Sequence, residues 1–349
     1  MTTHRIRLLS SMIAVFATMV LAIAGAGPLS DSFTNWLDHA AIKYRTTPPR
    51  DPVAELNRKL LNGSVQLTFD GPAGYLRSVL NALHVSVDSQ IAVFAKDSVQ
   101  QTRISMGNPR TLFFNDSVAV GWVRGGFVEL AAQDPQQGVV FYVLDQKLVS
   151  RPQFKRSDGC LSCHYSYGTV GVPGMLVRST LQFTVDHTVP LPKRWGGWYV
   201  TGHHGSIRDL GNADVNKLFE TPLPSNTFNW QTLEGKFDTT GYLSTQSDIV
   251  ALMVFEHQMH LMNLLSRIGW EARIADFQKH AGMIAPSRLD DHSDAPVQID
   301  AAAKEVVDYM LFVDEAPLAD KIVGSSGFSA TFSAQGPLDS KGPLCRECR

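Results

Sequence analysis

The sequence predicts an α+β fold, with an antiparallel strand meander at its centre and flanking helices, and two patterns predict this class. Between residues 91 and 144, short runs rich in Val, Phe, Tyr and Trp alternate with turn signals, a pattern typical of antiparallel strands. Apolar residues recur at helical spacing on both sides of these runs, between Asp51 and Gly63 and over 75–83, 247–273 and 297–312. We therefore expect strands near the middle of the chain and helices toward its ends.

The first two predicted helices precede the strands. Asp51 is a good N-cap residue and Pro52 suits the first helical position, while Gly63 ends the pattern. We expect the apolar face of this helix to consist of Leu56, Leu60 and Leu61. Residues 75–83 show a second apolar stripe at helical spacing.

The strand runs are short and are separated by turns. The five runs of the meander are Ile91–Ala95, Thr111–Phe114, Val118–Val123, Phe127–Ala131 and Val139–Leu144. The intervening segments 115–116, 124–126 and 134–138 carry Asn, Asp, Gly and Pro, as turns do. Two later segments, Leu176–Val185 and Trp198–Thr201, also favour strands.

The strongest helix signal spans 247–273. We expect Ser247 to cap this helix, with Asp248 in its first turn. A further helix is expected over 297–312, and no regular structure is expected over 324–349.

The pentapeptide Cys160-Leu161-Ser162-Cys163-His164 follows the meander. C-x-x-C-H is the attachment signature of a c-type haem, in which two thiols form thioethers and the adjacent histidine binds the iron. A redox dithiol and half of a zinc site are the alternatives for the two cysteines. His164, directly after Cys163, favours one covalent haem c with His164 as a metal ligand.

The N-terminus has the layout of a secretory signal peptide. Arg5 and Arg7 precede an almost wholly apolar run over 12–26, and alanines near its end give A-x-A cleavage sites after Ala24 or Ala26. An uncleaved anchor is the alternative, but the run is shorter than the ~20 residues of a membrane span. We expect residues 1–26 to be removed, no stable membrane span afterwards, and a periplasmic protein.

Composition and the position of the motif suggest how the rest of the chain is organised. The 18% charged residues and the net charge of -2 give no basic field for nucleic acid. C-x-x-C-H occurs once, so we expect a single haem. We divide the chain into a signal peptide (1–26), an entry segment (27–50), a haem-binding α+β domain (51–280) and a C-terminal helix with a tail (281–349).

At the motif and over roughly 20 residues after it, the chain resembles the cytochrome c superfamily. It is not similar to the small all-helical cytochromes c, because the residues before Cys160 lack helical periodicity. Overall it resembles uncharacterised, exported monohaem cytochrome c-domain proteins of bacteria, through CLSCH, GVPG at 171–174 and KRWGGWYVTG at 193–202. The resemblance to cytochromes c implies that the Pro173 carbonyl accepts a hydrogen bond from the second nitrogen of His164; otherwise 172–174 is a turn before the next strand.

The sixth iron position has several candidates. Our choice is His257, which falls on an apolar stripe of the helix over 247–273 formed by Val250, Val254, Leu261, Leu264 and Ile268. The alternative for His257 is a satisfied core histidine. The other candidates are Met175 and Met259, which are otherwise core residues, and His203 and His204, which otherwise face solvent.

Several other residues have both a functional and a structural interpretation. Trp195, Trp198 and Tyr199 either line a haem edge or pack as a core strand. Lys193 and Arg194 either pair with haem propionates or end a solvated strand. Glu256 and His260 have the spacing of a surface ion pair on a helix.

Cys345 and Cys348 form a second C-x-x-C with no histidine after it, so they are not a second haem site. We expect a disulfide or two free thiols there. A zinc site with Cys160 and Cys163 would abolish haem attachment.

These observations predict an exported cytochrome that exchanges single electrons with redox partner proteins. One alternative is a haem enzyme, a peroxidase or small-molecule reductase with an open distal site. The other is a structural or sensory haem-binding module that acts on a partner protein.

Overall fold

The computed structural model describes residues 36–180, 183–214, 228–281, 295–334, 338–339 and 342–343. The expected signal peptide and the cysteine pair at 345 and 348 lie outside these residues. The chain divides into two compact units, residues 1–46 and 47–349. In the first, residues 36–46 form turns closed by backbone hydrogen bonds, such as the 2.8 Å bond from Tyr44 N to Leu37 O. All elements below belong to the second unit.

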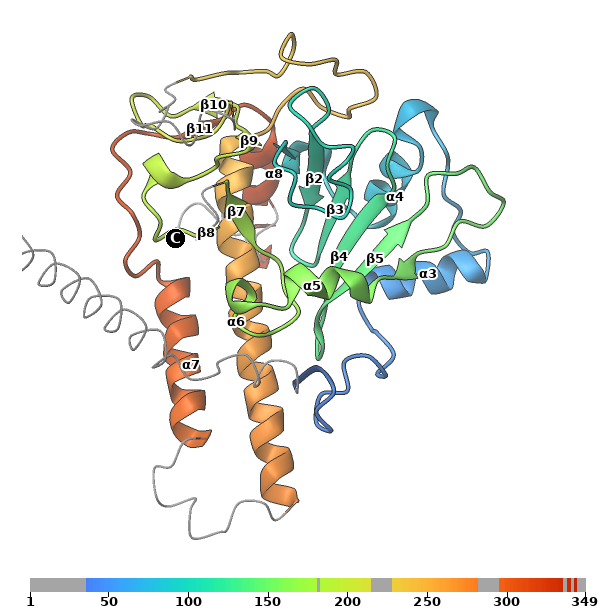
Figure 1. Ribbon diagram of the computed structural model, residues 1–349, viewed down its shortest axis with the longest axis vertical. Coiled ribbons are helices and arrows are strands. Elements are labelled where there is room, and N and C mark those ends of the chain that lie inside the picture. The colour runs from blue at the N-terminus through green and yellow to red at the C-terminus, as the bar shows by residue number, and fades with distance from the viewer. Residues whose placement is uncertain are drawn as a thin grey trace, which may run out of the picture. The chain divides into compact units, whose positions relative to one another are not determined.

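A seven-stranded antiparallel sheet forms the centre of the larger unit (Figure 1). Its strand order is β6-β5-β4-β3-β2-β1-β9, so the five expected strands pair in sequence order, as a meander does. This confirms the α+β class. The strands are β1 (Ile91–Val93), β2 (Arg110–Phe114), β3 (Val118–Trp122), β4 (Val128–Asp134), β5 (Gly138–Leu144), β6 (Lys155–Arg156) and β9 (Trp198–Tyr199).

Helix α3 (Pro52–Leu61) covers one face of this sheet. Asp51 caps it as expected, accepting hydrogen bonds from Val53 N and Ala54 N, and its other oxygen accepts a 2.5 Å bond from the Tyr142 hydroxyl on β5. The buried residues of α3 are Val53, Leu56 and Leu60. Leu61, which we expected on that face, is 52% exposed because it ends the helix on the solvent side.

Helix α6 (Ile249–His280) crosses the opposite face of the sheet. The Phe255 ring lies 4.9 Å from Phe114 of β2, and Ser266 accepts a 2.8 Å hydrogen bond from Gln133 of β4. The buried side of α6 includes Leu252, Phe255, Met259, Met262 and Trp270. This differs from the stripe expected from the sequence, since the helix also packs against segments other than the sheet.

The start of α6 corrects one expectation. Asp248, not Ser247, is the N-cap: its carboxylate accepts hydrogen bonds from Val250 N and Ala251 N. Ser247 instead joins the helix to the sheet, because its hydroxyl donates to Tyr199 O and accepts from Ala92 N. Asp248 therefore caps the helix, and Ser247 attaches its start to the sheet.

The remaining elements are short, apart from α7. They are α4 (Leu76–Ala82), α5 (Leu161–His164), α7 (Ala295–Met310), α8 (Phe328–Ala334), and the strand pairs β7 (Val177–Ser179) with β8 (Phe183–Val185), β10 (Gly202–His203) with β11 (Val323–Gly324), and β12 (Leu338–Asp339) with β13 (Gly342–Pro343). The segment from 324 onward therefore contains regular structure that we did not expect. Contacts with a distant part of the chain hold this segment in place: Ser326 donates hydrogen bonds to the carboxylate of Asp248, at the start of α6.

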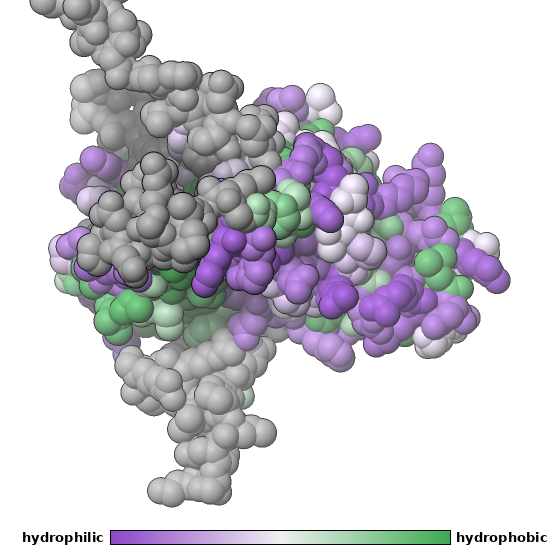
Figure 2. Space-filling model, turned by 90° about the horizontal axis from the view of Figure 1, so that it is seen from below, coloured by the Kyte–Doolittle hydropathy of each residue, from purple (hydrophilic) through white to green (hydrophobic). Residues whose placement is uncertain are grey.

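In the part of the chain that the structure describes, no helix has the length and hydropathy of a membrane span. The described surface in Figure 2 is mostly hydrophilic, with scattered apolar residues.

Candidate functional site

The C-x-x-C-H motif forms a single helical turn that follows β6. A 3-10 turn over Asp158–Cys160 continues directly into α5. In Figure 1 this turn lies in front of the sheet, beside α6, and the ring of His164 is 4.9 Å from Phe141 on β5. The motif is therefore held on the same face of the sheet as α6.

Both motif cysteines are free thiols that solvent reaches. Cys163 is exposed and Cys160 is half-buried, with its thiol 3.6 Å from the Ser157 hydroxyl. Burial raises the pKa of Cys160, which keeps this thiol protonated. The two side chains are accessible to a group that would be attached to them.

The next loop fixes the orientation of the His164 ring. Its Nδ1 lies 2.9 Å from the carbonyl oxygen of Gly174, and Gly174 N donates a 2.9 Å bond to His164 O. Because a carbonyl only accepts, Nδ1 carries the proton and Nε2 presents its lone pair. No hydrogen bond within the described residues occupies Nε2. Burial lowers the pKa of His164, which favours the neutral imidazole that a metal ligand requires.

Gly174, and not Pro173 as expected, supplies the carbonyl that accepts the hydrogen bond of His164. An antiparallel bridge between Tyr165 and Pro173 sets the register, so Gly174 is the residue opposite the His164 ring. The Pro173 carbonyl instead accepts a 2.9 Å hydrogen bond from Val139 N. The resemblance to cytochromes c identified the right loop but placed the acceptor one residue too early.

Helix α6 holds the far end of this loop. Asn263 binds the backbone of Met175 twice, accepting from Met175 N at 3.1 Å and donating to Met175 O at 2.6 Å. Val170 packs against the cluster of Leu264, Val306 and Tyr309, which joins α6 to α7. The carbonyl that orients His164 is thus anchored to the longest helix.

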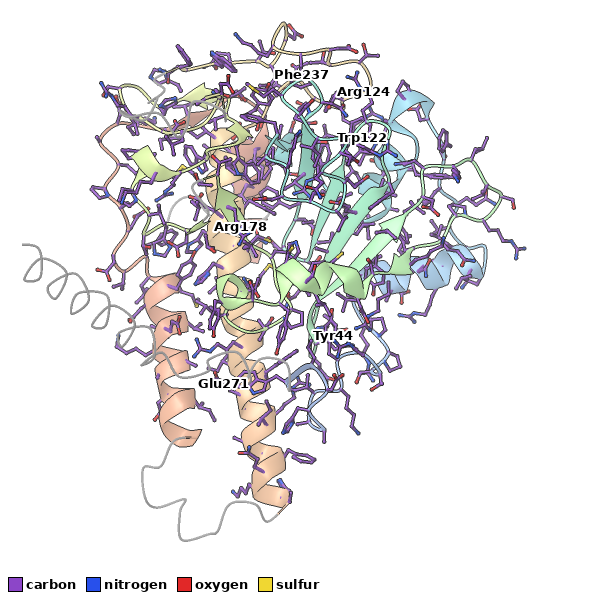
Figure 3. The ribbon with its side chains drawn as sticks, in the orientation of Figure 1. Tyr44, Trp122, Arg124, Arg178, Phe237 and Glu271 are labelled. Carbon is purple, nitrogen blue, oxygen red and sulfur yellow. The ribbon has the colours of Figure 1, made fainter. Side chains whose placement is uncertain are left out.

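Three charged side chains lie close enough to affect the motif. The charges of Arg110 and Arg178 lower the pKa of His164, and that of Glu129 raises it. Arg110 and Glu129 form an ion pair of 2.8 Å between β2 and β4, while Arg178 projects from β7 (Figure 3). We did not identify these residues from the sequence, because strand register brings Arg110 and Glu129 together and Arg178 comes from the separate β7–β8 pair.

His257 lies in an aromatic cluster between α6 and α7. Its ring stacks on Tyr309 and Phe312, at centroid distances of 4.6 and 4.2 Å, and its Nδ1 is 3.0 Å from Nδ1 of His187. Within the described residues no hydrogen bond, ion pair or ring contact joins His257 to the motif, and the cluster alone accounts for its burial. Its role as the sixth ligand stays a prediction.

The other sixth-ligand candidates occupy different surroundings. Met175 and Met259 are buried, and His203 is exposed on β10. His204 is buried, contrary to the expectation of a solvent-facing loop, because its Nδ1 is bound to the Ile207 carbonyl at 2.8 Å. Nearby, burial raises the pKa of Asp209 to about 7.

Arg194 is not a free propionate partner or part of a solvated strand end. It is 1% exposed and forms an ion pair with Glu256, which is 2% exposed. The second oxygen of Glu256 accepts a 2.9 Å hydrogen bond from the indole of Trp195. The expected Glu256–His260 surface pair is therefore replaced by a buried one, and Trp195, Trp198 and Tyr199 pack in the core.

The histidine cluster predicts a pH dependence of stability. Burial lowers the pKa of His257 to about 4, with further lowering by His187 and His260 and an opposing effect of Asp186. The unfolded chain binds this proton near pH 6.5, so the contribution of His257 is complete above pH 6.5 and lost as pH falls toward 4.

We expect the urea midpoint of the wild type to fall more steeply between pH 6.5 and 4 than that of His257→Phe, which retains the ring packing. Equal slopes in the two proteins would contradict this assignment.

Searches against protein-family models, curated proteins and solved structures found no match to this chain. Among the described residues, no group of three or more His, Cys, Asp or Glu side chains could hold a metal ion. A haem iron needs only one or two protein ligands, because the porphyrin supplies the others.

Proposed function

We propose that this chain is a c-type cytochrome with one covalent haem, and that it transfers single electrons to and from redox partner proteins. Cys160 and Cys163 would hold the group, and His164 would be the proximal iron ligand. The observation that carries this proposal is the bond from His164 to the Gly174 carbonyl, which leaves Nε2 free beside two accessible thiols.

The motif residues suit thioether attachment. Each thiol would add across a vinyl double bond, forming one C–S and one C–H bond and breaking S–H, so no oxidant is consumed. Bound haem supplies a one-electron couple between ferrous and ferric iron. Gly174 would hold the imidazole in one tautomer and raise its basicity, the usual effect of an acceptor behind a metal ligand.

The leader-like N-terminus supports export to the periplasm as part of the same proposal. In families with this motif, haem is attached outside the bacterial cytoplasm, so the two sequence signals are consistent with one another.

The optical and EPR spectra of the purified holoprotein test electron transfer against enzyme chemistry. If His257 is the sixth ligand, both redox states should be low-spin with bis-histidine signals, and His257→Ala should give a high-spin ferric form that binds CO once reduced. His280→Ala, at an exposed histidine of the same helix that is not a ligand candidate, is the matched control and should leave the spectrum unchanged.

Three other outcomes are informative. A low-spin spectrum that survives in His257→Ala would exclude His257. A methionine–iron charge-transfer band would transfer the assignment to Met175 or Met259. A wild type that is already high-spin and binds CO would favour the haem enzyme over the electron carrier.

A further inference from the structure

The residues that the structure describes cover only part of the sheet face that carries the motif. Its strand register defines two neighbouring rows of side chains on this face. The first row is Phe114, Ala119, Ala131 and Phe141, and the second is Leu112, Gly121, Glu129 and Val143. Residues paired across antiparallel strands point to the same side, so each row is one line across β2, β3, β4 and β5.

The residues at the two ends of the first row are covered by other side chains. Phe114 packs on Phe255 of α6, and Phe141 packs on His164 of the motif. In the second row, Leu112 and Val143 remain half-buried, whereas residues on the other face, such as Leu130 and Tyr142, are buried under α3. The second row therefore places two half-buried apolar side chains, Leu112 and Val143, on either side of the Arg110–Glu129 ion pair beside the motif.

The side chains of Leu112 and Glu129 lean over the middle of this surface. Gly121 has no side chain, and a Cβ built there would lie 3.1 Å from Leu112 and 3.2 Å from a Glu129 carboxylate oxygen, so the position has little room for one. Ala131, diagonal to it, is also small. Four adjacent strands span about 14 Å at ~4.8 Å per step, which suits a flat ring system rather than a chain.

One arginine near the motif has no acid of its own. Arg110 is already paired with Glu129 at 2.8 Å, and Ser98 at 3.1 Å and Gln100 at 3.0 Å complete the contacts of that carboxylate. Arg178, whose charge acts on His164, makes no side-chain hydrogen bond or ion pair within the described residues. Arg178 is therefore able to bind a carboxylate.

We propose that Leu112, Gly121, Ala131 and Val143, here called the sheet shelf, form the wall against which the tethered porphyrin lies, with Arg178 binding a propionate. This inference rests on the proposed function. It follows from the shelf's continuity with His164 through Phe141, from the half-buried apolar side chains of Leu112 and Val143, and from an arginine near the motif that has no acid of its own.

The shelf is tested by haemin binding to the full chain carrying Cys160→Ala and Cys163→Ala, so that affinity is not masked by the covalent bonds. In this background Leu112→Glu and Val143→Glu should each weaken haemin binding at least tenfold. Leu61→Glu, a change of the same type at an exposed leucine of α3, should leave it unchanged. Val143→Thr, which keeps the shape of the side chain, should weaken binding in the same direction and covers the case in which the glutamates prevent folding.

Arg178 is tested with haemin and its dimethyl ester, which has no free carboxylates. The starting protein should bind haemin at least fivefold more tightly than the ester, and Arg178→Gln should remove most of that preference. Arg58→Gln, at an exposed arginine of α3, should retain it.

The outcomes separate the two proposals. If the wild type carries covalent haem but the shelf and arginine variants match their controls, the shelf is wrong and the cytochrome assignment stands. If the wild type takes up no covalent haem in a host that matures c-type cytochromes, both are overturned.

Discussion

Cys160→Ala together with Cys163→Ala should abolish covalent haem in this protein. With its leader, in a host with a cytochrome c maturation system, the wild type should stay coloured in a haem-stained denaturing gel, and the double variant should be colourless. The reason is chemical: a thioether needs a thiol, and these are the two thiols next to His164. Each single variant should retain at most one thioether.

The second C-x-x-C provides the matched control. Cys345→Ala together with Cys348→Ala removes the same number of thiols but should leave the haem stain at the wild-type level, because no histidine follows that pair. Covalent haem in the 160/163 double variant, or its loss from the 345/348 variant, would refute the assignment of the site.

Glu256→Ala should destabilise the fold by about 3–5 kcal/mol, the usual cost of leaving one partner of a buried ion pair uncompensated. The change leaves the Arg194 guanidinium with no carboxylate at a position that is almost inaccessible to solvent, and it also removes the acceptor of the Trp195 indole. Urea unfolding followed by far-UV circular dichroism measures the difference.

Two variants serve as controls. Glu55→Ala breaks the exposed pairs with Arg58 and Lys59 and should cost less than about 1 kcal/mol, as surface pairs do. Arg194→Met combined with Glu256→Leu removes both charges and should recover much of the lost stability. A cost for Glu256→Ala as small as that for Glu55→Ala would contradict the importance of this pair.

The parts of the fold that are encoded locally could be predicted from the sequence. The five strands of the meander emerged close to their observed bounds because their apolar runs are separated by residues that favour turns. The Asp51 cap was equally clear, since its preference for that position depends only on the next few residues.

Features that depend on tertiary partners could not be predicted in this way. Ser247 and Asp248 are both good caps, and only the sheet decides that Ser247 binds Tyr199 and Ala92 while Asp248 caps α6. From the sequence alone, Arg194 is expected to be a solvated residue beside aromatic side chains. In the fold it is buried and pairs with Glu256, which lies 62 positions later in the chain.

The candidate site shows the same division. Cys160, Cys163 and His164 could be predicted because they are adjacent in the sequence. The residue that accepts the hydrogen bond of His164 depends on the Tyr165–Pro173 bridge, and it is Gly174 instead of the expected Pro173. Arg110, Glu129 and Arg178 come from three different strands, and no spacing in the sequence joins them to the motif.

The intact mass of the purified full chain, measured under denaturing conditions after expression with a cytochrome c maturation system, tests the central claim most directly. We expect the polypeptide mass plus one haem, with the added mass located by peptide mapping on the segment that contains Cys160 and Cys163. A chain of unmodified mass, with both thiols free to react with an alkylating reagent, would contradict the account.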